Sequence, residues 1–214
     1  LPGDGSVQLA ETTTGRAVLV VAGPKSRDLL SPLTHEDLSN EAFPWLTERE
    51  IEIAGIPVRA MRVNYVGELG WELHHEMPYQ RTLYDRIMEA GADLGVANFG
   101  TAAMNSMRLE KAYRAWGSDM NVEVTPIEAG LDRLVKRKDR DFTGKAAIEK
   151  QLAEGIKWRC VLMKVDSPDR DAATNAPIYK GEKVIGIVSS GGYGHTVGSS
   201  LALGYVPLDK VREG

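Results

Sequence analysis

The chain has 214 residues, with 26 Lys and Arg against 30 Asp and Glu and a formal net charge of −4. This acidic balance speaks against a dedicated nucleic-acid surface, which is usually basic. Because Cys160 is the only cysteine, an internal disulfide, a Cys-based zinc site and an iron–sulfur cluster are excluded. The longest apolar run, 17–22, is too short to span a bilayer, so we expect no membrane association.

The N-terminal part of the chain predicts strands mixed with short helices. Residues 16–22 are short, apolar and rich in valine, which is typical of a buried strand, and 26–30 can form a short helix. Two further strands are predicted over 51–53 and 58–65, around a turn at 55–57.

Four helices are predicted next. Pro78 opens the first one at its first turn, and apolar spacing continues it to Gly91. The second covers 101–111. The third starts at Thr125-Pro126-Ile127-Glu128, whose residue types form a capping box. Thr143 is the predicted cap of the fourth, which ends at Gly155.

After residue 156 the pattern becomes β-rich. Strands are predicted over 158–165, 178–180, 183–189 and 201–206. We therefore predict an α+β fold, with an α+β domain over 1–155 and a small β-barrel-like module over 156–214.

The densest motif begins at Tyr65 and ends at Glu72. Two glycines three residues apart, Gly67 and Gly70, permit a tight turn or a close backbone approach. A carboxylate that leaves such a turn can accept two parallel hydrogen bonds, for example from the amino-pyrimidinone edge of a pterin. The alternative is a plain hairpin with Tyr65 and Trp71 in the core.

A second motif gathers positive charge at the end of the 101–111 helix. Arg108, Lys111 and Arg114 would complement the helix dipole there, which is a structural reason for their presence. The functional alternative is an anion-facing pocket with aromatic walls at Tyr113 and Trp116.

Other candidate sites are weaker. The glycine-rich segment 189–195 opens no helix, so we predict a bulged turn rather than a phosphate-binding loop. No two histidines have the spacing of a helical metal site, and we expect surface histidines and no metal. Cys160 is predicted to be a small core residue.

Taken together, these stretches resemble the folate-binding family of glycine-cleavage T-protein (aminomethyltransferase). Five ordered motifs carry the resemblance: Tyr65-x-Gly67-Glu68-x-Gly70-x-Glu72, Ser106-Met107-Arg108-Leu109-Glu110, Thr125–Leu131, Phe142-x-Gly144-Lys145 and Leu201–Val206. Their variants look most like the C-terminal folate domain of dimethylglycine and sarcosine dehydrogenases, which is fused there to an FAD-dependent amine oxidase.

The resemblance implies tetrahydrofolate as the cofactor, in a ring of three subdomains. In the family, the pterin lies in a central hole of this ring. By resemblance, Glu72 would accept hydrogen bonds from the pterin and Tyr65 would line the hole. Trp116 would supply an aromatic wall, and Arg108 is carried over as a folate contact. Where the family usually has an arginine, this chain has Met104.

The resemblance also implies a longer parent enzyme. No segment matches the family's upstream catalytic aspartate or a dinucleotide fingerprint, so the catalytic residue is not assigned here. We expect the C-terminal part of a longer polypeptide, inactive alone, with FAD in a preceding domain.

The expected function is tetrahydrofolate-dependent one-carbon transfer that forms 5,10-methylenetetrahydrofolate. The alternatives are a stand-alone aminomethyltransferase acting on a lipoyl carrier protein, and a folate-binding or scaffold module without transfer activity. The expected location is the cytoplasm, or the mitochondrial matrix in a eukaryote.

Overall fold

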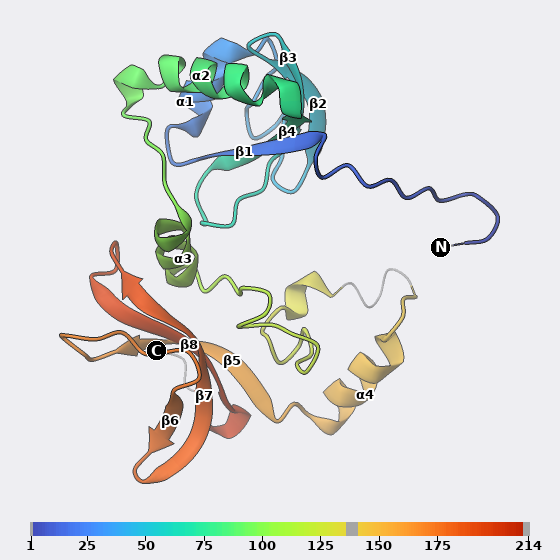
Figure 1. The fold of residues 1–214 in the computed structure, drawn as a ribbon. Coiled ribbons are helices and arrows are strands. Elements are labelled where there is room, and N and C mark those ends of the chain that lie inside the picture. The colour runs from blue at the N-terminus through green and yellow to red at the C-terminus, as the bar shows by residue number, and fades with distance from the viewer. Residues whose placement is uncertain (1, 136–140, 212–214) are drawn as a thin grey trace. The chain divides into compact units, whose positions relative to one another are not determined.

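A computed structural model of the chain describes residues 2–135 and 141–211 (Figure 1). It forms two compact units, Leu1–Phe99 and Gly100–Gly214, and each contains a four-stranded antiparallel sheet. Helices and sheets together confirm the predicted α+β class. The predicted domain boundary after residue 155 is a different division from that between the two compact units, and it stays a prediction.

Over its described residues, unit 1 contains one sheet and two α-helices. Its elements are β1 (Arg16–Ala22), α1 (Ser26–Leu30), β2 (Glu48–Ile53), β3 (Ile56–Met61), β4 (Gly70–Glu76) and α2 (Gln80–Ala90). The strand order is β1-β4-β3-β2, so β4 lies inside the sheet. The strand predicted over 58–65 ends at Met61, and the chain then leaves the sheet to form the connection to β4.

The core of unit 1 lies on one face of its sheet. Side chains alternate along β4, so that Trp71, Leu73 and His75 are buried while Glu72 and His74 are half-buried on the opposite face. Leu29 of α1 and Leu83 of α2 pack into the same buried cluster as Trp71 and Leu73. Both helices therefore cover the core face.

Unit 2 contains the second sheet, in the order β5-β8-β7-β6. Its elements are α3 (Thr101–Glu110), α4 (Lys145–Glu154), β5 (Trp158–Val165), β6 (Pro177–Lys180), β7 (Lys183–Gly194) and β8 (Ser199–Pro207). Leu109 of α3 packs against Cys160, Leu201 and Leu203, which confirms Cys160 as a core residue. Residues 189–195 form no separate turn, because β7 continues to Gly194 with an irregularity between Val188 and Ser190.

The capping box at Thr125 forms. The Glu128 N–H donates to Thr125 Oγ1 over 3.2 Å, and the Thr125 N–H donates to Glu128 Oε2 over 3.0 Å. The Thr125 hydroxyl also lies 2.8 Å from Gln151 Oε1 of α4. These reciprocal bonds satisfy backbone donors that a helix start leaves free.

The prediction of a helix after this box is wrong, because the helical backbone ends after one turn. Gly130 has a φ of +77°, and its N–H donates to the Ile127 carbonyl while the Leu131 N–H donates to the Pro126 carbonyl. This pair of bonds is a Schellman C-cap, which terminates helical backbone at a left-handed glycine.

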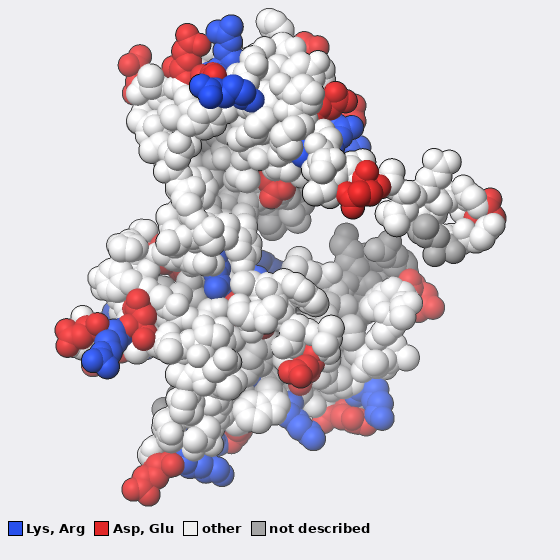
Figure 2. All heavy atoms as spheres, viewed as in Figure 1, with Lys and Arg blue, Asp and Glu red and all other residues white. Residues whose placement is uncertain are grey.

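The surface of the described residues carries mixed charge. Figure 2 shows acidic and basic side chains interspersed on the visible face, in keeping with the nearly balanced composition. Within the described part of the chain, no helix has the length and apolar character needed to cross a membrane.

Thr125→Ala should lower the free energy of unfolding by about 1 kcal/mol, because the turn loses its cap. The matched control is Thr143→Ala. The N-cap of α4 is Gly144 rather than the predicted Thr143, and that helix has no side-chain cap bond. Thermal unfolding should separate the two variants, and equal losses would contradict a specific role for the box.

Candidate functional site

The β3–β4 hairpin carries the predicted site residues Tyr65 and Glu72. Tyr65 is half-buried in the connection, and Glu72 is the third residue of β4. Gly67 has a φ of +73°, as a tight turn requires. At Gly70, a Cβ atom would lie 2.4 Å from the Val21 carbonyl oxygen, so only glycine fits against β1 there. One glycine therefore makes the turn and the other permits close packing.

Asn64 holds this connection in shape, a role that the sequence analysis missed. Its Nδ2 donates to the Glu68 carbonyl over 2.8 Å, and its Oδ1 accepts the Val66 N–H over 2.7 Å. The available signal was an asparagine just before a glycine turn, because asparagine side chains often bond to backbone two residues on. Asn64 therefore fixes the path by which the chain enters β4.

Glu72 lies on the side of the first sheet that α1 and α2 do not cover, which we call the open face. The register places these side chains, among others, on it: Val18, Val20, Glu48, Glu50, Arg59, Met61, Glu72 and His74. Glu72 stands directly between Val20 of β1 and Met61 of β3. Its carboxylate is therefore flanked by apolar surface on both sides.

The Glu72 carboxylate interacts with the neighbouring His74. Oε2 lies 3.1 Å from His74 Nε2, and the two side chains are 32% and 34% exposed. Among the described residues, the carboxylate forms no other hydrogen bond. The other oxygen, Oε1, is thus available to a ligand that offers hydrogen-bond donors.

A rigid aromatic platform lies behind Glu72 on the core face. The fully buried Trp71 packs edge-on against Phe43, with ring centroids 6.2 Å apart. Arg27 and Arg62 lie 5.9 and 5.8 Å from its ring centroid, within cation–π range. Burial lowers the pKa of the Arg62 guanidinium, and the nearby Arg27 adds to this. These contacts confirm Trp71 as core and immobilise the backbone beside Glu72.

The expectation of surface histidines is wrong for His75. The side chain is buried, with Nδ1 2.8 Å from the Leu73 carbonyl oxygen and Nε2 2.8 Å from Gln80 Oε1. Strand alternation places it on the core face, where its two ring nitrogens need partners. Among the described residues, no cluster of three His, Cys, Asp or Glu side chains could hold a metal ion.

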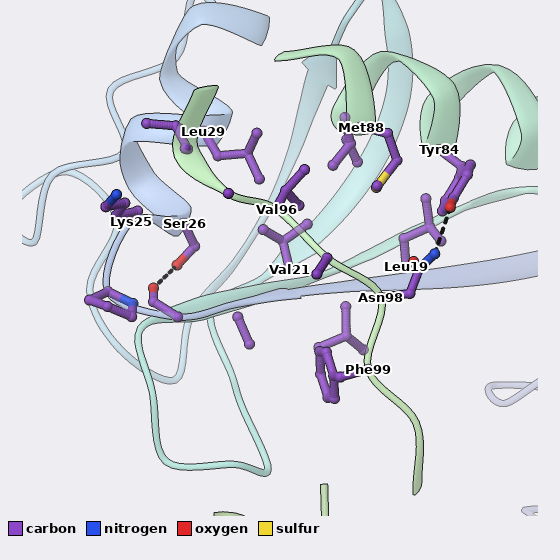
Figure 3. A pocket seen from close by; sticks show the side chains of 18 residues that line it. Leu19, Val21, Lys25, Ser26, Leu29, Tyr84, Met88, Val96, Asn98 and Phe99 are labelled. Carbon is purple, nitrogen blue, oxygen red and sulfur yellow. Dashed lines mark hydrogen bonds between the residues drawn. The ribbon is translucent and has the colours of Figure 1, made fainter. Parts of the chain in front are cut away.

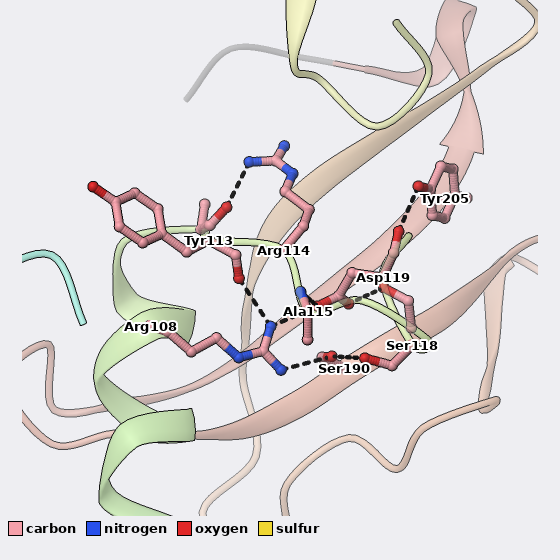
Figure 4. A network of polar contacts seen from close by, with 10 residues as sticks. Arg108, Tyr113, Arg114, Ala115, Ser118, Asp119, Ser190 and Tyr205 are labelled. Carbon is pink, nitrogen blue, oxygen red and sulfur yellow. Dashed lines mark hydrogen bonds and ion pairs between the residues drawn. The ribbon is translucent and has the colours of Figure 1, made fainter. Parts of the chain in front are cut away.

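Arg108 of α3 lies in a buried polar network in unit 2 (Figure 4). Nη1 donates to Asp119 Oδ2 over 2.5 Å and to the Tyr113 carbonyl over 3.0 Å, and Nη2 donates to Ser190 Oγ over 2.9 Å. The network joins α3, the segment after it and β7. Both terminal nitrogens of Arg108 are therefore engaged within the protein.

Asp119 is the centre of this network, and sequence reasoning missed it. Its side chain is fully buried and accepts hydrogen bonds from Arg108, from the Ser189 hydroxyl over 2.5 Å and from the Ala115 N–H over 2.9 Å. The Tyr205 hydroxyl donates to its carbonyl over 2.7 Å. Burial raises the pKa of the Tyr205 hydroxyl, which remains protonated as a donor.

Trp116, the fourth predicted site residue, lies in the loop after α3. It is 74% exposed and forms an isolated bridge with Met120. An exposed indole of this size is a candidate contact surface for a planar ligand. Tyr65 and Glu72 thus belong to unit 1, and Arg108 and Trp116 to unit 2.

Two cavities accompany these residues. The cavity of unit 1, about 470 Å³, runs along β1 and is mainly apolar, with Tyr84 bonded to Asn98 at its wall (Figure 3). The cavity of unit 2, about 490 Å³, is more polar and has Arg108, Ser118 and Ser190 in its wall. Glu72 lines neither, and it lies on an open sheet face.

Glu110 of α3 ties the helix to the turn between β7 and β8. Its Oε1 accepts the N–H groups of Thr196 over 2.6 Å and Val197 over 3.2 Å. Burial acts to raise the pKa of the carboxyl, but the bonds from Val197 and Thr196 outweigh it, so the pKa lies below its ordinary value.

Asp119→Asn should destabilise the protein by about 3–5 kcal/mol, because it leaves the buried guanidinium of Arg108 without its counter-charge. The control is Asp85→Asn, which breaks an exposed pair with Arg81 at 2.7 Å. Urea unfolding of the control should match the wild type. Equal stability of Asp119→Asn and the wild type would refute the network's structural role.

Glu110→Gln should lower stability at pH 7, and the deficit should shrink in acid. A carboxyl whose folded pKa is depressed stabilises the fold above its unfolded pKa, and that stabilisation is lost as the pH falls through the folded pKa. Unfolding measured from pH 7 to pH 3 tests this. A deficit that stays constant over the whole range would mean that the charge of Glu110 contributes nothing.

Comparison with known proteins gives a consistent result for both halves of the chain. Residues 1–139 match the GCVT N-terminal domain, and residues 159–214 match the glycine cleavage T-protein C-terminal barrel domain. The chain is 46% identical over 208 residues to mitochondrial dimethylglycine dehydrogenase of Rattus norvegicus, and 38% identical over 216 residues to mitochondrial sarcosine dehydrogenase of Mus musculus. Each match covers 97% of this chain but only 24% and 23% of those proteins.

The solved structures agree. The glycine cleavage system aminomethyltransferase T from Bartonella henselae is similar with a TM-score of 0.81 and 28% identity, over 93% of this chain and 54% of that one. Sequence models that match most of the chain and a close structural similarity lead to the same assignment. The chain belongs to the glycine-cleavage T-protein (aminomethyltransferase) family.

Proposed function

We propose that the chain binds tetrahydrofolate and takes part in one-carbon transfer, as a segment of a dimethylglycine or sarcosine dehydrogenase-like enzyme. The observation that carries this proposal is the Glu72 carboxylate on the open face, with one oxygen bonded to His74 and apolar side chains on both sides. The identity to dehydrogenases over 97% of the chain supports it.

The geometry at Glu72 fits the donor edge of a pterin. The 2-amino group and N3–H present two parallel donors, and an ionised carboxylate is an acceptor with several lone pairs. Val20 and Met61 stand on either side of Glu72 and offer apolar contact to a flat ring. A charge-assisted pair of bonds in such surroundings is both stronger and more directional than a neutral one.

The role of this chain's residues is to bind and orient the folate. When bound, tetrahydrofolate supplies two nitrogens that take up a one-carbon unit as 5,10-methylenetetrahydrofolate, and FAD in an upstream domain would oxidise the methylated amine. Holding the folate fixed makes the capture effectively intramolecular. Tyr65 and Trp116 remain proposed folate contacts, whereas Arg108 was expected as one from the sequence. Since Arg108 is buried, we place its contribution in holding the loop that carries Trp116.

A second candidate is a stand-alone aminomethyltransferase that acts on a lipoyl carrier protein. The similarity to the Bartonella henselae aminomethyltransferase favours it. The coding sequence upstream separates the candidates, because a dinucleotide-binding fingerprint there would indicate the dehydrogenase type. In either case we propose that this 214-residue segment alone is inactive. The proposed location is the mitochondrial matrix in a eukaryote and the cytoplasm otherwise.

Glu72→Gln in the full-length polypeptide should weaken folate binding by about tenfold to a hundredfold, on the basis of roughly 1.5–3 kcal/mol for a hydrogen bond to a charged group. The amide keeps the shape but removes the charge and one acceptor oxygen. Calorimetric titration with folinic acid measures the change, and the unfolding midpoint should stay constant.

The matched control is Glu68→Gln on the same hairpin. Glu68 is exposed, and its contact with Asn64 uses the backbone carbonyl. This variant should bind folinic acid within a few-fold of the wild type. Equal weakening by both variants, or none by Glu72→Gln, would remove the basis for a pterin site at Glu72.

A further inference from the structure

The side chain next to Glu72 on the open face has no role in the folate contacts proposed above. His74 is two residues further along β4 and points to the same side. Its Nε2 lies 3.1 Å from Glu72 Oε2. A carboxylate accepts and does not donate, so the bond requires a proton on Nε2 of His74.

We propose that His74 is a positioning residue, which fixes the rotamer of Glu72 and directs its free oxygen toward the pterin edge. This rests on the proposed function of Glu72. A glutamate side chain has several rotamers, and restricting them upon binding costs conformational entropy. A hydrogen bond that selects the binding rotamer in the free protein reduces that cost, as preorganisation does in general.

Among the described residues around His74, Glu72 is the one that forms a hydrogen bond with its ring. Across the sheet His74 faces Val18 on β1, which offers no polar group, and Arg59 on β3. Arg59 is directed to β2, where Nε lies 3.7 Å from Glu48 and Nη2 lies 3.7 Å from Glu50. The charged groups around His74 on this face are Glu72 and Glu76 of β4, Arg16 of β1, Arg59 of β3 and the two β2 glutamates. Among the described residues, only Glu72 is within hydrogen-bond distance.

The arrangement also explains why one oxygen of Glu72 is left for a ligand. His74 engages Oε2 from along the strand, while Val20 and Met61 occupy the positions across it. Because the side chains of Val20 and Met61 cannot donate hydrogen bonds, neither of them competes with a ligand for Oε1. The bond to His74 thus orients the carboxylate without saturating it.

The test is a double-mutant cycle in the full-length polypeptide, with folinic acid as the probe. His74→Leu should weaken binding by about threefold to tenfold, the effect expected of losing one partly exposed hydrogen bond that acts through Glu72. In a Glu72→Gln background the same change should cost less than about twofold, because the carboxylate that it orients is gone. His74→Gln, which keeps an N–H donor, should restore most of the affinity.

The control is His35→Leu, which alters an exposed histidine of unit 1 that lies outside the strands and should leave binding unchanged. Unchanged affinity in His74→Leu, while Glu72→Gln still weakens binding, would overturn the positioning role alone. Equal weakening by His74→Leu in both backgrounds would also overturn it, since His74 would then contact the ligand itself. If Glu72→Gln leaves affinity intact, the pterin placement fails and this proposal fails with it.

Discussion

The alternation of side chains along β4 is the constraint on which unit 1 depends. One strand supplies Trp71 and Leu73 to the core and Glu72 and His74 to the open face. A shift of register by one residue would exchange the two sets, burying a carboxylate and exposing an indole. The close contact of Gly70 with β1 prevents that shift, because no other residue could pack against the Val21 carbonyl. The core and the proposed binding face are therefore fixed by the same backbone.

In unit 2, by contrast, a pair of charged side chains is buried. The ion pair of Arg108 with Asp119 is buried, and buried ions stabilise a fold only when their remaining hydrogen-bonding capacity is met. Here the Ser189 and Ser190 hydroxyls and the Ala115 N–H meet most of that capacity, while Arg108 Nε has no hydrogen-bond partner among the described residues. The network fastens α3 and its following loop to β7. The positive charge of Arg108 thus serves mainly to build the unit, while the Trp116 side chain of the same motif is exposed.

Local patterns predicted much of the secondary structure. The bounds of β1, α1 and β5 agree with the predictions to the residue, because valine-rich or alternating runs ended by turn residues are strong local signals. The prediction of a helix after Thr125 was wrong, because the left-handed backbone of Gly130 ends the helical segment after one turn. The centre of the polar network could not be foreseen, because Asp119 meets Ser189 across 70 residues of chain. For the same reason, local patterns did not show that α3 packs on the second sheet.

The stability of unit 1 and its proposed binding role reside on opposite faces of one sheet. A half-exposed pair such as Glu72 and His74 adds little to folding, since solvent screens it and the unfolded chain solvates both groups well. The same pair can contribute strongly to binding, because a ligand that covers it removes that screening and strengthens each hydrogen bond. Residues that contribute little to the fold and lie where a ligand would exclude water are free to be tuned for that ligand. On this sheet, the core face limits which side chains can change, and the open face is where sequence changes can adjust the proposed folate binding without unfolding the protein.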